Sequence, residues 1–126
     1  MKLVASLRAL TGLGDAAGGT DHWWGQRITG LALVVLGLWF AASLVVLPSL
    51  EHHIVVEFIG TPLNRLLMSM LCLAAAYHSY LGVQVVIDDY VHAAGLNRAS
   101  MVVSRIGHVV VAAVAVYAIL EIGGGA

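Results

Sequence analysis

The residue best placed to do chemistry in this sequence is His78, which lies in the middle of an apolar segment. The same segment ends with Asp88, Asp89 and Tyr90. If the segment is a helix, Gly82 and Asp89 lie within about 40° of the face that carries His78, since each residue advances by about 100°. An ionisable side chain among apolar residues is energetically costly and by default indicates a function. One helix face therefore carries both an imidazole and a carboxylate.

The imidazole of His78 is suited to bind the iron of a haem group. Histidine nitrogen is a common axial ligand of haem iron. Gly82 lies four residues further on, which is about one helical turn, and leaves space for the face of a porphyrin. We therefore predict that His78 is an axial ligand of a b-type haem and so binds the haem iron. The alternative is a packing role, in which the ring only hydrogen-bonds a neighbouring helix.

The second axial ligand is expected to come from a partner subunit. His108 is the other candidate in this chain, but it lies near the start of the third predicted helix. Helical rise then places it several Å from the depth of His78, whereas two axial nitrogens must nearly face one another across the iron.

Asp89 and Tyr90, at the end of the same segment, are suited to bind a quinone. A phenol can hydrogen-bond a quinone carbonyl, and a neighbouring carboxylate can hold it or relay protons. The alternative is a solvated helix end with a tyrosine at the membrane interface. Helical phase favours Asp89 over Asp88 as the working acid, because Asp89 shares the face of His78.

The composition is that of a membrane protein. Of the 126 residues, 60% are hydrophobic and 10% are charged, against about 25% charged residues in soluble domains. The formal net charge is −1, so the chain lacks the basic surface that nucleic acid requires as a partner. The single cysteine, Cys72, allows no disulfide, zinc cluster or four-thiolate iron–sulfur site within the chain. Redox chemistry must therefore use another cofactor or another subunit.

Three apolar segments are long enough to cross the membrane, since about 20 helical residues span the ~30 Å hydrocarbon core. They cover residues 28–47, 63–87 and 104–122. Open strands are excluded because they leave backbone groups unpaired in lipid. We predict an all-α membrane domain, residues 28–122, with three transmembrane helices that form part of a heteromeric helix bundle. An N-terminal segment, residues 1–27, precedes it, and a C-terminal tail, residues 123–126, follows.

The basic residues predict the orientation of the chain. Five of the six lie on one side of the predicted spans, namely Lys2, Arg8, Arg27, Arg98 and Arg105. The opposite side has only Arg65. Because basic residues concentrate on the cytoplasmic side, we expect the N-terminus to be cytoplasmic (or in the matrix) and the C-terminus to lie outside.

Two segments resemble a known family. The first is "HWWGQRITG", with an Arg-x-Thr pattern at the start of the first predicted helix. The second is His78 followed eleven and twelve residues later by Asp89 and Tyr90. Together with the three-span plan, they make the chain similar to the D-type small membrane-anchor subunit (cytochrome b556 small subunit) of succinate dehydrogenase, respiratory complex II. The resemblance covers nearly the whole chain.

The resemblance implies specific residue roles. His78 would be one haem b ligand, and Tyr90 with Asp89 would border the ubiquinone headgroup site. Arg27 would lie near a haem propionate or the quinone pocket, as its charge also suggests.

The resemblance also implies partners and a location. The C-type cytochrome b anchor subunit would complete the haem site and most of the quinone site, while the flavoprotein and iron–sulfur subunits oxidise succinate and deliver electrons. The chain would then be a membrane subunit of succinate dehydrogenase (quinone), without flavin and not catalytic alone. It would lie among lipids as a multi-pass protein of the bacterial or mitochondrial inner membrane.

Two other functions remain open at this point. A fumarate reductase-type anchor uses similar chemistry. A small proton-relay or transporter subunit without haem would use His78 and Asp89 along one face.

Overall fold

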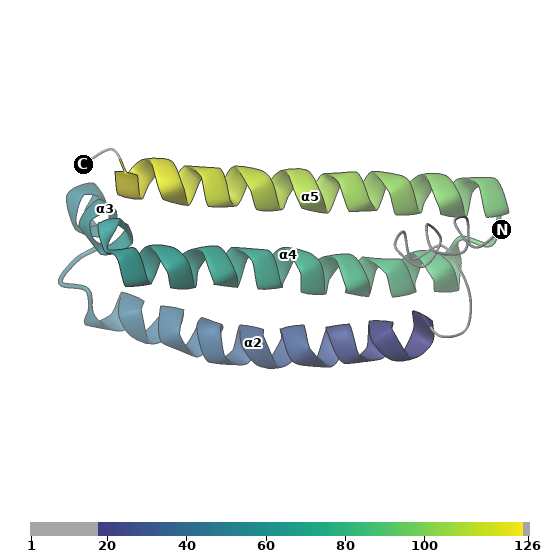
Figure 1. Ribbon diagram of the computed structural model, residues 1–126, viewed down its shortest axis with the longest axis horizontal. Helices are drawn as coiled ribbons and strands as arrows, with labels where there is room; N and C mark the ends of the chain where they lie inside the picture. Colours follow the sequence, from purple (N-terminus) through teal and green to yellow (C-terminus); the bar gives the residue numbers. More distant parts are fainter. Residues whose placement is uncertain (1–17, 125–126) are drawn as a thin grey trace, which may run out of the picture.

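The computed structural model describes residues 18–124, and the regular structure within this range is entirely helical (Figure 1). The helices are α2 (Gly18–Val46), α3 (His52–Gly60), α4 (Pro62–Tyr90) and α5 (Ala94–Gly124). Three of them, α2, α4 and α5, are long and apolar enough to cross a membrane. The predicted all-α fold with three transmembrane helices is confirmed.

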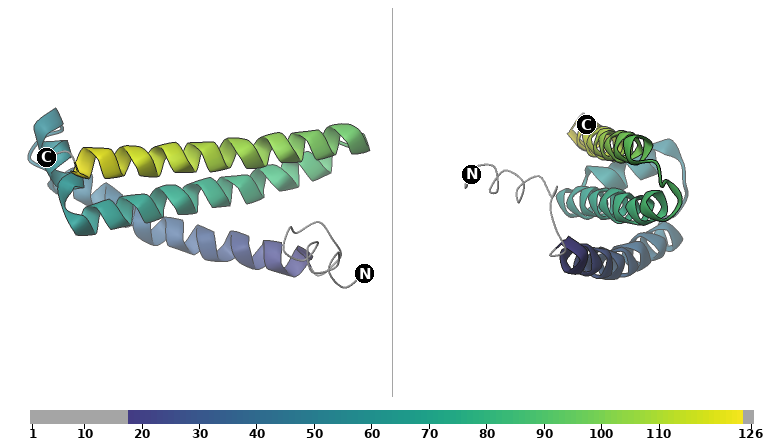
Figure 2. Two further views of the ribbon diagram at one scale, coloured as in Figure 1. Left: turned by 45° about the horizontal axis from the view of Figure 1, so that its top comes forward. Right: turned by 90° about the vertical axis from the view of Figure 1, so that its right-hand side faces the viewer.

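The three long helices lie in a single row with α4 in the middle (Figures 1 and 2). Helix α4 packs against α2 on one side and against α5 on the other, whereas α2 and α5 do not meet within the described residues. The chain reverses direction at each connection, so the start of α2, the end of α4 and the start of α5 lie at the same end (Figure 1). We call this the α4 C-terminal end, and it carries the residues with predicted quinone roles.

The helices are longer than the spans that hydropathy marks. Helix α2 begins well before Ile28, and α5 begins well before residue 104. A helix of 29 residues such as α2 is about 44 Å long, which matches a bilayer with its headgroups, whereas hydropathy detects only the hydrocarbon core. Parts of the predicted end segments are therefore helical, while residues 1–17 and 125–126 lie outside the described range.

At the opposite end, the short helix α3 packs against α4 and α5. The rings of Trp39 on α2 and Phe58 on α3 stack with centroids 6.2 Å apart. Asn64 Nδ2 donates to the carbonyl of Phe58 at 2.9 Å, and Arg65 Nη2 donates to that of Gly60 at 2.9 Å. These bonds satisfy carbonyl groups that the end of a helix leaves without partners. Arg65, the isolated basic residue on this side, thus fixes the α3–α4 connection.

The chain has almost no core of its own. Among the described residues only three hydrophobic side chains are buried, Leu36, Leu81 and Ile119. Many large apolar side chains on the outer faces of the row are exposed. In a membrane these faces meet lipid or other helices, because apolar surface of this extent is not left in water.

Candidate functional site

His78 lies near the middle of α4 and faces α2. Its Nδ1 atom is 3.0 Å from Oγ1 of Thr29. The same hydroxyl oxygen lies 2.6 Å from the carbonyl oxygen of Gly25, one turn earlier on α2. Within residues 18–124, the Nε2 atom of His78 makes no hydrogen bond. One nitrogen of the predicted ligand is therefore held by the protein, while the other has no partner among the residues that the structure describes.

Glycines on α2 allow this close approach of the two helices. A Cβ atom at Gly30 would lie 3.4 Å from Cε1 of His78, and one at Gly25 would lie 3.2 Å from Cδ1 of Leu81. On α4, a Cβ atom at Gly82 would lie at an ordinary contact distance of 3.8 Å from Nε2 of Gln26. The two helices therefore lie close together near His78, because both α2 and α4 place glycines in their interface.

A polar row on α2 faces α4, and the sequence analysis missed it. It consists of His22, Gln26 and Thr29, spaced at i, i+4 and i+7. His22 Nε2 lies 3.1 Å from the carbonyl oxygen of Leu81 and can donate to it. The signal that would have revealed this row is its helical spacing, but His22 and Gln26 lie before residue 28, where the first span was predicted to begin.

The Gln26 side chain leaves one polar atom without a partner. Its Oε1 atom is buried and accepts no hydrogen bond among the described residues. A buried polar atom left in this state costs about 1–3 kcal/mol. This atom lies on a side chain beside Gly82, one turn from His78, and can accept a hydrogen bond from a group beyond the described residues.

Arg27 points away from this interface. The side chain is exposed, and its guanidinium carbon lies 4.9 Å from the ring centroid of Trp23, on the same helix. The described residues show no contact of Arg27 with His78, Asp89 or Tyr90. Any contact of Arg27 with a haem propionate or a quinone would therefore form on the outer face of α2.

At the α4 C-terminal end, the two neighbouring acids have different surroundings. Asn97 Nδ2 donates to Oδ1 of Asp88 at 3.2 Å and lies 3.2 Å from the carbonyl oxygen of Val91, so it ties the turn between α4 and α5. Asp89 is exposed and makes no hydrogen bond within the described range. Asp88 thus belongs to the turn, whereas Asp89 has its carboxylate free.

Tyr90 is 78% exposed, so the described residues provide no wall around its phenol. It lies twelve residues after His78, or about 18 Å along the helix axis. The structure therefore does not gather His78 and Tyr90 into one pocket. They lie at two levels of α4, and any quinone pocket at Tyr90 needs walls from beyond the described residues.

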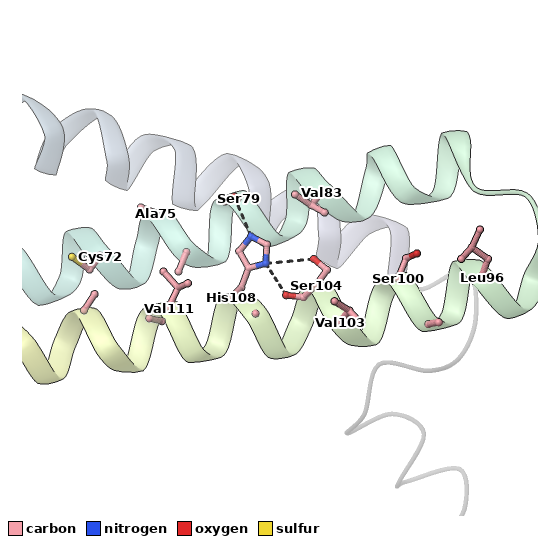
Figure 3. Close-up of a pocket in the computed structure, with 15 residues that line it drawn as sticks. Cys72, Ala75, Ser79, Val83, Leu96, Ser100, Val103, Ser104, His108 and Val111 are labelled. Carbon is pink, nitrogen blue, oxygen red and sulfur yellow. Dashed lines mark hydrogen bonds between the residues drawn. The ribbon is translucent and has the colours of Figure 1, made fainter.

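His108 lies on the other side of α4, in a groove between α4 and α5 (Figure 3). Its Nε2 atom is 3.1 Å from Oγ of Ser79, and its Nδ1 atom is 2.7 Å from the carbonyl oxygen of Ser104. Since Ser79 follows His78 directly, the two histidines lie at nearly the same depth. The predicted difference in depth was wrong, because α5 begins at Ala94, well before the predicted start of that span.

The groove itself has a volume of about 940 Å³ and is lined mainly by small residues such as Ala75, Ser79 and Gly107. Arg105 Nε donates to the hydroxyl of Tyr80 at 3.1 Å, beside the ring of His108. Both ring nitrogens of His108 have protein partners, and α4 separates it from the α2 side. His108 is therefore not placed opposite His78.

A family model described as succinate dehydrogenase/fumarate reductase transmembrane subunit matches residues 6–120. This chain belongs to that family.

Three curated relatives share the name succinate dehydrogenase hydrophobic membrane anchor subunit. The one from Paracoccus denitrificans is 30% identical over 126 residues, which cover all of this chain and 97% of the relative. The one from Rickettsia bellii is 33% identical over 78 residues, or 62% of each chain. The one from Rickettsia felis is 28% identical over 105 residues, covering 83% of this chain and 88% of the relative.

These matches confirm the predicted resemblance to the small anchor subunit of succinate dehydrogenase. With the three apolar helices, they also confirm the predicted location as a multi-pass inner-membrane protein. The candidate site residues of α4 lie on its α2 side and at its C-terminal end.

Proposed function

We propose that this chain is a membrane-anchor subunit of a succinate:ubiquinone oxidoreductase. It shares a haem b with a C-type cytochrome b anchor subunit and forms part of the quinone-reduction site. Flavoprotein and iron–sulfur subunits supply the electrons, which pass to ubiquinone. The observation that carries this proposal is His78, an imidazole near the middle of a membrane-spanning helix, with Nδ1 held by Thr29 and Nε2 without a partner among the described residues.

The residues around His78 fit a haem group. A ligating histidine usually donates its second N–H to a protein oxygen, and Thr29 offers that oxygen here. The buried Oε1 atom of Gln26 has no partner within the described chain, and Gly82 adds no side chain beside it. Haem b, when bound, supplies a one-electron carrier inside the membrane. His78 would hold the iron through Nε2, and the partner anchor would supply a second ligand.

The end of α4 supports a role for Asp89 in quinone binding. The carbonyl end of a helix carries partial negative charge, so acidic residues in its last turn are unfavourable by about 0.3–1 kcal/mol each. At Asp88 the Asn97 amide offsets this effect. Nothing in the described chain offsets it at Asp89. A free carboxylate beside the exposed Tyr90 phenol is suited to hold that hydroxyl and to transfer protons from the cytoplasmic side.

The two other functions have less support. The relatives named above are succinate dehydrogenase subunits, which supports the succinate-oxidising direction over a fumarate reductase. A proton relay would need a chain of hydrogen bonds from His78 to Asp89. These residues are about 16 Å apart along α4, and within the described range no hydrogen bond of either residue leads toward the other.

The haem role is tested by a reduced-minus-oxidised visible spectrum of the complex that co-purifies with this chain. The wild-type complex should show a b-type α-band that His78→Ala abolishes or shifts, because the variant removes an axial nitrogen. His108→Ala is the matched control, since it removes an imidazole at nearly the same depth on the other side of α4. A wild-type complex without haem, or a His78→Ala spectrum identical to wild type, would contradict the proposal.

A further inference from the structure

The hydrogen bonds around Thr29 determine which atom donates to which. A threonine hydroxyl has one hydrogen, and a backbone carbonyl can only accept. The carbonyl of Gly25 lies 2.6 Å from Thr29 Oγ1, and that of Gln26 lies 3.3 Å away. The hydroxyl hydrogen therefore points to Gly25, which is the usual bond from a threonine to the carbonyl four residues earlier. Thr29 Oγ1 is left as an acceptor on its α4 side.

His78 must then be the donor in the 3.0 Å contact. If Nδ1 instead accepted a hydrogen from Thr29, the 2.6 Å contact between the hydroxyl oxygen and the Gly25 carbonyl would have no hydrogen between its two oxygens. A neutral imidazole carries a single N–H group. With that hydrogen on Nδ1, the lone pair of the ring is on Nε2.

We infer that Thr29 is a positioning residue that holds His78 as the Nδ1–H tautomer and so presents Nε2 to the haem iron. This inference rests on the proposed function, because it concerns the ligand that the haem would use. A hydrogen bond from the second ring nitrogen to a protein oxygen fixes the orientation of the ring and makes the ligand more basic. Thr29 thereby sets both the geometry and the electron donation of His78.

Two further features of α2 support a fixed ring. Threonine is branched at Cβ, so few side-chain rotamers are open to it in a helix, and the bond to Gly25 selects one of them. Gly30 follows directly, and its missing side chain leaves room for the ring of His78, since a Cβ atom there would lie 3.4 Å from Cε1. Rotation of the imidazole about its Cβ–Cγ bond would break the Thr29 bond.

The test uses the intact complex with three substitutions in α2. Thr29→Val keeps the branched shape and removes the hydroxyl, whereas Thr29→Ser keeps the hydroxyl. Ser43→Ala is the matched control, because Ser43 makes the same kind of bond to the carbonyl of Trp39 at 2.8 Å but has no bond to another helix. The readouts are haem content, the low-spin electron paramagnetic resonance spectrum and the haem midpoint potential. Subunit co-purification reports assembly.

We expect Thr29→Val to shift the low-spin spectrum and to raise the midpoint potential, because a less basic ligand stabilises the oxidised iron less. Thr29→Ser and Ser43→Ala should behave as the wild type. Unchanged spectrum and potential in Thr29→Val would overturn the inference and leave the haem role of His78 standing. A wild-type complex without haem would instead overturn the proposed function itself.

Thr29→Ala provides a second route if the valine variant does not assemble. It removes the same hydroxyl without adding a methyl group at the hydroxyl position, and the same shifts are expected. If both variants fail to assemble while His78→Ala assembles, Thr29 serves helix packing rather than the tautomer of His78, and the inference is wrong.

Discussion

At the residue scale, the two neighbouring aspartates of α4 differ in one hydrogen bond. Asp88 receives the Asn97 amide at 3.2 Å and so helps to close the turn into α5. Asp89 lies next to it, exposed and without a hydrogen bond among the described residues. Both carry the same charge at the same helix end, so a difference in function between them must come from these surroundings.

We therefore expect Asp89→Asn and Tyr90→Phe to lower ubiquinone reduction by about tenfold or more, as for the loss of a positioned proton donor or acceptor. Asp88→Asn removes the same charge as Asp89→Asn but keeps an oxygen that accepts from Asn97, so its activity should stay near wild type. The measurement compares succinate oxidation with ubiquinone and with an artificial dye as the acceptor. An equal loss with both acceptors would indicate failed assembly instead of a quinone defect.

At the element scale, the feature that matters is the narrow α2–α4 interface. Gly25 faces the buried side chain of Leu81, and Gly30 faces the ring of His78. Small residues at helix interfaces are typical of membrane proteins, because they allow backbones to approach closely. The short Thr29–His78 contact depends on this approach, so the glycines of α2 determine how closely His78 lies to Thr29.

Gly25→Ala should destabilise this interface, because its Cβ atom would lie 3.2 Å from Cδ1 of Leu81, a side chain that is only 4% exposed. Overpacking of this kind costs about 1–3 kcal/mol. Gly37→Ala, on the same helix, is the control, since nothing lies within 4 Å of its added atom. Thermal loss of the haem spectrum in the purified complex should begin at a lower temperature in Gly25→Ala than in Gly37→Ala. The same temperature for both would contradict a close α2–α4 contact.

At the scale of the whole molecule, the chain is a row of three helices with apolar outer faces (Figure 2). A row cannot enclose a ligand, so a haem or quinone site needs helices from other subunits. The row also separates its charged residues. Arg98 lies in the first turns of α5, at the α4 C-terminal end, and Arg105 lies further along α5 beside Tyr80. Arg65 lies in the first turns of α4, at the opposite end.

This separation predicts the orientation of the chain in the membrane. In a Cys72→Ala background, the variant His92→Cys should react with a membrane-impermeant maleimide only from the cytoplasmic side. The variant His53→Cys should react only from the outside, because the His53 side chain, in α3, is 71% exposed. The reverse pattern in intact and inverted vesicles would show that the orientation is opposite to the prediction.

The sequence by itself determined the three helices, the position of His78 within a span and the carboxylate–phenol pair at the end of that span. These properties are local, because hydropathy over about 20 residues and helical periodicity need no knowledge of neighbouring helices. Family membership followed from the same local patterns.

Only the tertiary structure decided what surrounds each of these residues. In the folded chain, Thr29 contacts His78 and His108 contacts Ser79. Asn97 donates a hydrogen bond to Asp88 and none to Asp89. These contacts depend on the register between helices, which is set by where each helix begins and by side-chain packing at the interfaces. Hydropathy does not mark those helix starts, because the helices continue beyond the apolar core of the membrane.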